Sequence, residues 1–188
     1  TETSQAFKVD LQSVREKTDE LGALLYIDAT GSIGLEDYHV LADVAAFSSC
    51  KGLFGLTGAC FIAYKKKLKS VKISNFYFNI DTHENKRVTG PYHAVASLYG
   101  VMKIHDELRM RVKNSKTYVM ENWPDLIRGK ENQPLLCTYL KGRVVPKDDS
   151  VVLYSPRSEL PGSVVCHFGE IHYDKVSIGN RISIETGR

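Results

Sequence analysis

The chain begins with a pattern of apolar and polar positions typical of a surface helix. In the stretch DLQSVREKTDEL, Leu11, Val14 and Leu21 are apolar and the residues between them are mostly polar. This spacing places the apolar positions on one side of a helix. Asp10 and Gly22 are residue types that commonly cap the N-terminal and C-terminal ends of helices. We therefore expect a helix between them.

Three short apolar runs follow this helix. They lie at residues 23–27, 44–48 and 59–64, and each is nearly continuous rather than alternating. Runs of this kind are typical of strands covered on both faces of a parallel sheet. A helix followed by such strands predicts an α/β sheet, and open α/β sheets bind their ligands at the ends of the strands.

The pattern changes after residue 90. Residues 90–123 carry apolar positions with helical spacing and predict one long helix, which ends before Pro124. Beyond it, short apolar runs separated by proline and glycine predict the strands of a small α+β lobe, at residues 135–139, 150–154, 163–167 and 175–184. The chain is accordingly divided into residues 1–112, part of a larger α/β domain with its linking helix, and residues 113–188, a small α+β domain.

Two ionisable side chains stand at the ends of apolar runs. Asp28 follows the first run directly, and Lys51 comes shortly after the second. Taken singly, Asp28 is more often a turn or cap residue, and Lys51 is more often an exposed amine at a strand end. Together they match the needs of pyridoxal 5′-phosphate, which requires a lysine for its aldehyde and a carboxylate that keeps its pyridine nitrogen protonated.

The segments around these two residues resemble a known family. DATGSIG, which begins at Asp28, and SSCKGLFGLTGACFIAY, which contains Lys51, are similar to the core motifs of class V, fold-type I pyridoxal-phosphate aminotransferases, in particular the 2-aminoethylphosphonate:pyruvate and alanine:glyoxylate transaminase branch. Each motif is weak by itself, but their order and spacing match over the first half of the chain. The resemblance implies part of the family's large α/β domain, with a mainly parallel sheet, followed by a small α+β domain.

The resemblance also implies roles for individual residues. Lys51 would hold the cofactor as a Schiff base and move the proton during transfer, and Asp28 would face the pyridine nitrogen. Thr3, in the segment TETSQAF, falls where the family places a hydroxyl that binds the ring oxygen of the cofactor. Thr30 and Cys50 would lie beside the cofactor.

Three further residues are implied outside the core motifs. Arg87 and Thr89, in NKRVTGPY, fall where the family contacts the cofactor phosphate of the neighbouring subunit, which implies a homodimer with active sites at the interface. The family's arginine for the substrate carboxylate lies in a late segment where this chain has Ser177. Arg181, four residues further on, is the candidate replacement, and its alternative is an exposed arginine at a strand end.

The implied function is transfer of an amino group from a small amino acid or aminophosphonate to pyruvate or glyoxylate, so that donor and acceptor are both small molecules. Asp28 and Lys51 would equally serve a lyase or desulfurase on the same fold, and a cofactor-free interaction module derived from the fold is a third reading. In the family, a glycine- and serine-rich loop that holds the phosphate precedes the segment that begins here at Thr1. We therefore expect the chain to be the C-terminal part of a longer enzyme and to be inactive by itself.

Composition argues against several other classes. Apolar residues make up 43% and charged residues 25% of the chain, as in ordinary globular proteins, and the net charge is only +3. No apolar run is long enough to span a membrane, and no dense basic patch indicates nucleic acid. The four cysteines form no CxxC motif and the six histidines lack the spacing of metal ligands. We expect no metal site, a reduced cytoplasmic protein, and histidines with ordinary packing or surface roles.

Overall fold

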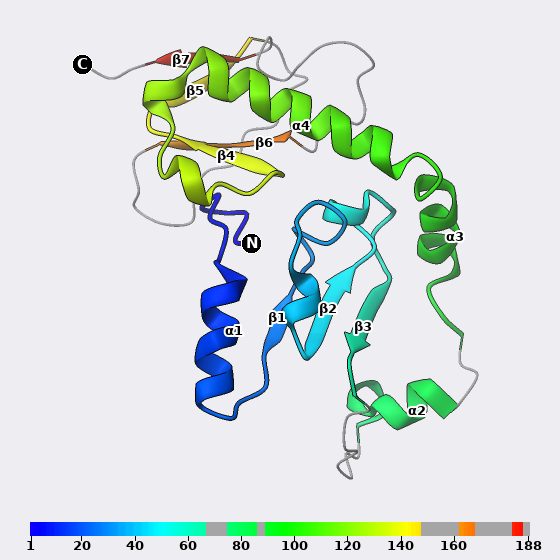
Figure 1. Ribbon diagram of the computed structural model, residues 1–188. Coiled ribbons are helices and arrows are strands. Elements are labelled where there is room, and N and C mark those ends of the chain that lie inside the picture. Colours follow the sequence, from blue (N-terminus) through cyan, green and yellow to red (C-terminus); the bar gives the residue numbers. More distant parts are fainter. Residues whose placement is uncertain (67–74, 86–88, 148–161, 168–181, 186–188) are drawn as a thin grey trace.

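The computed structural model describes residues 1–66, 75–85, 89–147, 162–167 and 182–185. The chain forms two lobes (Figure 1). A three-stranded sheet with helix α1 (Leu11–Glu20) beside it makes up the first lobe, and two small sheets make up the second. Helix α4 (His105–Asn122) runs along the second lobe, and the N-terminus lies between the lobes.

Helix α1 has the ends that its sequence predicts. Asp10 is the N-cap, and its side chain accepts hydrogen bonds from two backbone amides of the first turn at 3.0 and 3.3 Å. Gly22 follows the C-cap residue with a φ of +61°, a left-handed conformation that glycine adopts without strain. Arg15 pairs with Asp43 at 2.7 Å and so ties α1 to the residue that precedes the second strand.

The first sheet contains β1 (Tyr26–Asp28), β2 (Val44–Ser48) and β3 (Cys60–Tyr64) in that order. The three apolar runs thus form three strands, which confirms the prediction. β1 and β2 are parallel, whereas β3 runs antiparallel to β2, with Ser48 opposite Cys60. In the described part of the chain, the expected parallel arrangement therefore applies only to β1 and β2. A short connection returns β3 directly beside β2, and parallel pairing would need a longer crossover.

The strands of this sheet are less covered than their composition predicts. Val44 and Ala45 of β2 are buried, but Tyr26 of β1 and Ile62 of β3 are 59% and 49% exposed. The expectation of strands covered on both faces is therefore wrong for β1 and β3 within the described residues. The sheet presents apolar side chains to solvent here.

The long helix expected at residues 90–123 is two helices. α3 (Tyr92–Val101) and α4 are separated by residues 102–104, so the prediction of one continuous helix is wrong. Gly100 weakens the end of α3, and two acidic residues in the first turn of α4 favour a new helix start there. The shorter α2 (Ile80–Asn85) precedes both. Single 3₁₀ turns lie at His39–Leu41, Lys51–Leu53, Phe76–Phe78, Pro124–Leu126 and Lys130–Asn132.

The second lobe is built from two antiparallel strand pairs. β4 (Cys137–Leu140) pairs with β6 (Ser163–Cys166), and β5 (Arg143–Pro146) pairs with β7 (Ile182–Glu185). β4, β6 and β7 overlap runs that the sequence predicts as strands, whereas β5 has no counterpart in that prediction. The strand expected at residues 150–154 lies outside the described residues.

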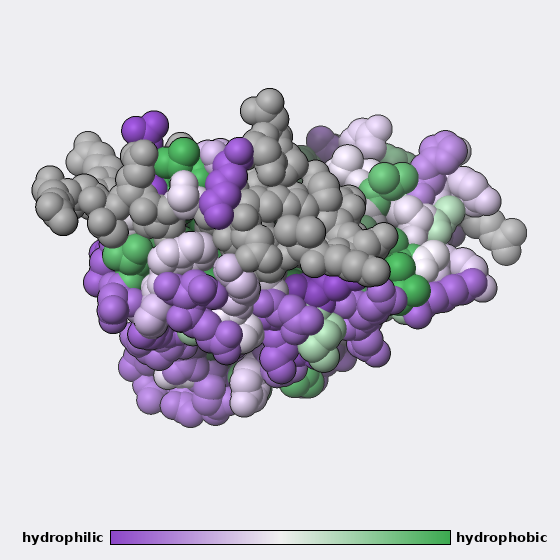
Figure 2. All heavy atoms as spheres, turned by 90° about the horizontal axis from the view of Figure 1, so that it is seen from above, coloured by the Kyte–Doolittle hydropathy of each residue, from purple (hydrophilic) through white to green (hydrophobic). Residues whose placement is uncertain are grey.

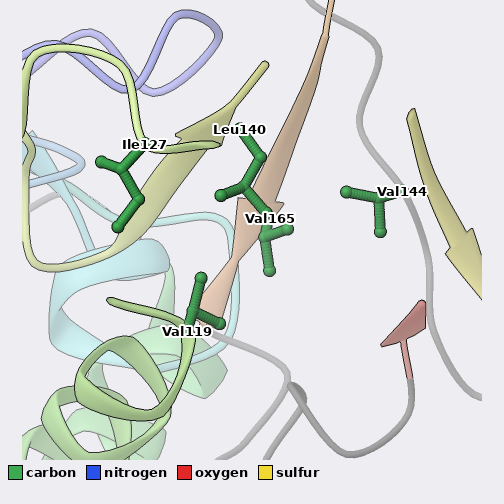
Figure 3. Packing of buried hydrophobic residues seen from close by; sticks show 5 residues of the cluster. All are labelled: Val119, Ile127, Leu140, Val144 and Val165. Carbon is green, nitrogen blue, oxygen red and sulfur yellow. The ribbon is translucent and has the colours of Figure 1, made fainter. Parts of the chain in front are cut away.

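An apolar cluster joins the second lobe to α4. Figure 3 shows its members from four different elements and one loop, namely Val119 of α4, Ile127, Leu140 of β4, Val144 of β5 and Val165 of β6. All five side chains are buried, and full burial of such a side chain contributes about 1.5–3 kcal/mol. Figure 2 views this side of the molecule from above, where the coloured residues are mostly hydrophilic with scattered apolar ones. The cluster therefore forms an interior apolar core between α4 and the strands of this lobe.

Candidate active site

Asp28 is the last residue of β1 and is held by the turn that follows. Its Oδ1 accepts a hydrogen bond from the backbone amide of Thr30 at 2.9 Å. This bond, a second from the Thr30 hydroxyl and the nearby charge of Lys51 lower the pKa of Asp28 below its usual value. The side chain is exposed. Asp28 therefore presents an ionised and accessible carboxylate at the end of the strand.

Lys51 begins a 3₁₀ turn shortly after β2. Its φ is +57°, a left-handed conformation that costs a residue with a Cβ about 1–2 kcal/mol. Phe54, at the end of the turn, has a φ of +60° and donates its amide hydrogen to the Lys51 carbonyl at 2.9 Å. Such conformations persist only where the surroundings hold them. The side chain of Lys51 is exposed, so its amine is accessible.

The turn after β1 and the turn after β2 pack directly against each other. The amide of Gly52 donates to the carbonyl of Thr30 at 3.2 Å. A Cβ on Gly52 would lie 2.3 Å from the carbonyl oxygen of Ile33, so this approach requires glycine. Because β1 and β2 are neighbouring parallel strands, both turns lie at the same edge of the sheet. The structure thereby brings Asp28 and Lys51 together.

A buried serine braces the loop that follows Lys51. The buried Ser49 accepts two hydrogen bonds. Its hydroxyl oxygen accepts one from the amide of Ala59 at 3.2 Å, and its backbone carbonyl accepts one from the amide of Gly55 at 2.8 Å. These bonds fasten the loop to the strand end that precedes Lys51. The sequence holds no signal that separates Ser49 from the adjacent Ser48, because the difference lies in long-range burial.

Thr3 lies against the turn that follows Asp28. A Cβ built on Gly31 would lie 2.8 Å from Cγ2 of Thr3, so the two segments approach closely only because residue 31 is glycine. The N-terminal segment is held by Ala6, which packs in an apolar cluster with Cys137 of the second lobe. The Cys137 thiol also donates to the Thr3 carbonyl at 3.6 Å. Thr3 is thus fixed beside the Asp28 turn by contacts with both lobes.

The other residues implied by the resemblance lie in different surroundings. Cys50 is half-buried, and its Sγ lies 3.1 Å from the hydroxyl oxygen of Ser48. Thr89 is exposed in the stretch that leads from α2 to α3, and its contact with a partner subunit stays a prediction. Arg87 and Arg181 lie outside the described residues.

A histidine that the sequence assigns to ordinary packing lies next to the Lys51 turn. His105 is the first residue of α4, and its Nε2 lies 3.0 Å from the carbonyl oxygen of Gly52. The two residues are far apart in the sequence. Neither the spacing of the histidines nor any motif indicates this contact, and only the break between α3 and α4 marks the position as unusual.

Two other features are absent from the part of the chain that the structure describes. That part holds no group of three or more His, Cys, Asp or Glu side chains placed to bind a metal ion. None of its helices combines the length and the apolar character needed to cross a membrane.

Several solved structures with a similar arrangement are aminotransferases. An alanine–glyoxylate aminotransferase from Nostoc sp. matches with a TM-score of 0.67 and 19% identity, over 89% of this chain and 55% of that chain. A phosphoserine aminotransferase from Cytophaga hutchinsonii matches with 0.65 and 14%, over 90% and 57%. A ureidoglycine–glyoxylate aminotransferase from Bacillus subtilis matches with 0.66 and 16%, over 88% and 52%.

The chain has an aminotransferase fold. This confirms, at the level of the fold, the resemblance to class V, fold-type I aminotransferases and the expected combination of a partial α/β domain with a small α+β lobe. The chain spans just over half the length of these aminotransferases. No protein-family model matches it, and no curated protein sequence matches it.

Proposed function

We propose that the protein containing this chain is a pyridoxal-phosphate-dependent aminotransferase. The observation that carries the proposal is the placement of Asp28 and Lys51 at the ends of two neighbouring parallel strands, on turns that are packed together. This placement occurs within an aminotransferase fold. A carboxylate and an amine are the two side chains that this cofactor requires most directly from its protein.

The described residues fit this cofactor. Asp28 is ionised and exposed, so it can hold a proton on the ring nitrogen. The exposed amine of Lys51 extends from a turn whose backbone is fixed. Gly31 carries no side chain in the space beside Thr3, which leaves the Thr3 segment close to the Asp28 turn. Asp28, Lys51 and Thr3, with Thr30 and Cys50, would hold the cofactor.

Asp28, Lys51 and Thr3 would each have a distinct task. When bound, the cofactor supplies an electron sink that stabilises the negative charge developing on the substrate carbon. Asp28 keeps the ring nitrogen protonated, because hydrogen bonds from Thr30 stabilise its ionised form. Lys51 would remove the proton from the substrate carbon as a general base and, as a general acid, deliver it to the aldehyde carbon of the cofactor. The hydroxyl of Thr3 orients the ring by donating a hydrogen bond.

The proposed substrates are small. Two of the compared aminotransferases are named for glyoxylate and one for phosphoserine. The proposal therefore takes a small amino acid or aminophosphonate as donor and pyruvate or glyoxylate as acceptor, with Arg181 at the substrate carboxylate. It includes a cytoplasmic homodimer in which Arg87 and Thr89 reach the partner's cofactor phosphate, and the division of the chain into residues 1–112 and 113–188.

Borohydride labelling tests the role of Lys51. The protein that contains this chain is mixed with pyridoxal phosphate and reduced, and the labelled peptide is identified by mass spectrometry. The pyridoxyl group should appear on Lys51 and be lost in Lys51→Ala. Lys65→Ala is the matched control, because Lys65 is an exposed lysine whose amine donates to the Leu41 carbonyl at 3.2 Å. Label on another lysine, or on none, contradicts the proposal.

Product analysis tests the type of reaction. With a labelled amino donor, transfer predicts that the donor nitrogen appears in the amino acid formed from pyruvate or glyoxylate. Release of the donor nitrogen as ammonia when neither pyruvate nor glyoxylate has been added would indicate a lyase instead. A labelled Lys51 with no turnover of any donor would argue against the aminotransferase reaction.

A further inference from the structure

His105 makes a specific hydrogen bond to the backbone of the Lys51 turn. Its side chain is only 7% exposed, and its Nε2 lies 3.0 Å from the carbonyl oxygen of Gly52. A carbonyl oxygen can only accept a hydrogen bond, so Nε2 must carry the hydrogen and donate it. The bond crosses from the first residue of α4 to the residue directly after Lys51.

The space around the imidazole is shaped to keep it in this position. Gly34 has a φ of +75°, and a Cβ there would lie 2.8 Å from both Cε1 and Nε2 of His105. The ring of Phe54 lies against the imidazole, with 5.2 Å between the ring centroids. The glycine that ends the DATGSIG segment and the aromatic residue that ends the Lys51 turn thus enclose the histidine.

Both polar backbone groups of Gly52 are consequently occupied. Its amide donates to Thr30 and its carbonyl accepts from His105. Lys51 itself has a left-handed backbone, which relaxes unless its neighbours hold it. Two hydrogen bonds on the following residue provide such a hold.

We propose that His105 is a positioning residue for Lys51: by donating to the Gly52 carbonyl, it fixes the left-handed turn from which the Lys51 amine reaches its target. The inference rests on the proposed function, in which Lys51 is the catalytic amine. A histidine that only fills space would be replaced without loss by an aromatic ring of similar size. A positioning histidine depends on its hydrogen bond.

Four variants separate the hydrogen bond from packing. His105→Phe keeps a ring beside Phe54 and removes the donor. His105→Gln keeps an N–H donor at a comparable distance from the backbone, and His105→Asn has the same amide on a shorter side chain. Leu108→Ala is the matched packing control, since Leu108 is buried on the next turn of α4 in a cluster with Phe54.

Hydrogen exchange tests the turn without any cofactor. In His105→Phe, the amides of Gly52 and Phe54 should exchange about tenfold faster relative to those of β2, because the turn opens locally. His105→Gln should stay within about threefold of the original protein. Leu108→Ala should leave this ratio unchanged. Unchanged relative exchange at Gly52 in His105→Phe would overturn the inference.

The labelling rate of Lys51 tests the consequence for chemistry. In His105→Phe, the rate of pyridoxyl labelling and kcat should both fall on the order of 10- to 100-fold, with the KM of the donor unchanged, because misplacement by about 1 Å has effects of this size. His105→Gln should recover most of the loss and Leu108→Ala should show none.

The outcomes distinguish this inference from the proposed function. If the original protein is not labelled on Lys51, the proposed function fails, and hydrogen exchange still decides whether His105 fixes the turn. If the original protein is labelled and His105→Phe is labelled at the same rate, the inference is wrong and the function stands. If His105→Phe does not fold, His105→Gln and His105→Asn decide. The inference requires the longer glutamine to reach the Gly52 carbonyl and the shorter asparagine to miss it, so equal labelling rates of Lys51 in these two variants would overturn it.

Discussion

The two lobes differ in how far they expose ionisable side chains to solvent. In the first lobe, Asp28 and Lys51 are exposed at a sheet edge, and hydrogen bonds from its own turn lower the pKa of Asp28. In the second lobe, Lys116 of α4, Cys137 of β4 and His167 are buried. The groups with the largest pKa shifts therefore lie outside the proposed site.

His167 shows how the second lobe holds a titratable group. It is completely buried, with Nδ1 2.9 Å from the hydroxyl oxygen of Ser115 and Nε2 2.9 Å from that of Thr138. Burial and, to a lesser extent, the charge of Lys116 lower the pKa of His167 to about 3. The imidazole is therefore neutral, and the two hydroxyls satisfy both of its nitrogens.

Lys116 and Cys137 follow the same rule. The Lys116 amine donates to the carbonyl of Gln133 at 3.2 Å and to that of Pro134, and burial lowers its pKa to about 8. Burial raises the pKa of the Cys137 thiol to about 12. The pKa shifts of Lys116 and Cys137 arise mainly because burial removes solvent from these groups, which support the fold. A shifted pKa indicates catalysis only where a reactant can reach the group, and the exposed Asp28, whose pKa is lowered, meets that condition.

The largest expected effect is a loss of stability at low pH, which arises from His167 in the second lobe. The unfolded chain protonates His167 below about pH 6.5, whereas the folded chain keeps it neutral down to about pH 3. The stability from this group is therefore complete above pH 6.5 and falls by about 1.4 kcal/mol per pH unit below it. Urea unfolding between about pH 6.5 and 4.5 should show about 3 kcal/mol of loss from this source.

Two variants isolate this contribution. His167→Asn should lose most of it, because asparagine does not titrate. His93→Asn removes an exposed histidine of α3 and should retain the original pH dependence. Parallel stability curves for all three proteins would contradict a neutral, buried His167.

Truncation of apolar side chains should also lower the free energy of unfolding by different amounts in the two lobes. Leu140→Ala, at a fully buried position in the cluster of Figure 3, should lower the free energy of unfolding by about 3 kcal/mol. Ile62→Ala, at the half-exposed side of β3, should lower it by less than about 1 kcal/mol. Urea denaturation measures both. An equal loss would mean that the apolar face of the first sheet is covered in solution, and the contrast in burial would fail.

The third prediction compares two aspartates: Asp28 is expected to support activity, and Asp43 is expected to support stability. Asp28→Asn should lower kcat of transamination about 100-fold, since a neutral amide cannot hold the proton on the ring nitrogen. Its stability should change little, because Asp28 is exposed and the side-chain oxygen of asparagine can still accept the hydrogen bond from the Thr30 amide. Asp43→Asn should do the reverse, because Asp43 accepts from Arg15 at 2.7 Å and from the amide of Leu25 at 2.8 Å.

Steady-state kinetics and thermal unfolding of the two aspartate variants complete this comparison. Loss of activity in Asp43→Asn to the same degree as in Asp28→Asn would assign both effects to a general disturbance of the sheet. A stable but inactive Asp28→Asn, beside a less stable but active Asp43→Asn, is the expected result.

Local patterns predicted the parts of the molecule that depend on neighbouring residues in the sequence. The cap residues Asp10 and Gly22 marked the ends of α1, and the apolar runs that end near Asp28 and Lys51 marked two strands of the first sheet. Because a strand end is defined by where its apolar run stops, the sequence also indicated where the two side chains would stand.

Features set by distant contacts could not be predicted in this way. The bond from His105 to Gly52 joins a helix start to a turn far away in the chain, and it favours a new helix at His105 where the apolar spacing alone predicts continuity. The pairing of β5 with β7 and the burial of His167 likewise depend on which segments meet in space. Neither leaves a local pattern.

The smallest expected effect is a gain in stability at Lys51. A left-handed backbone at a residue with a Cβ costs about 1–2 kcal/mol, of which the extra flexibility of glycine in the unfolded chain offsets about 0.5–1 kcal/mol. Lys51→Gly should therefore raise the free energy of unfolding by about 0.5 kcal/mol while it abolishes labelling.

Phe54→Gly is the informative counterpart of this variant, because Phe54 has nearly the same φ but a buried ring. It should be destabilised, since the loss of the ring outweighs the relief of the backbone. Urea unfolding of both variants decides the matter. A less stable Lys51→Gly would show that the Lys51 side chain supports the fold, as the buried groups of the second lobe do, and the contrast between the lobes would then not extend to the lysine.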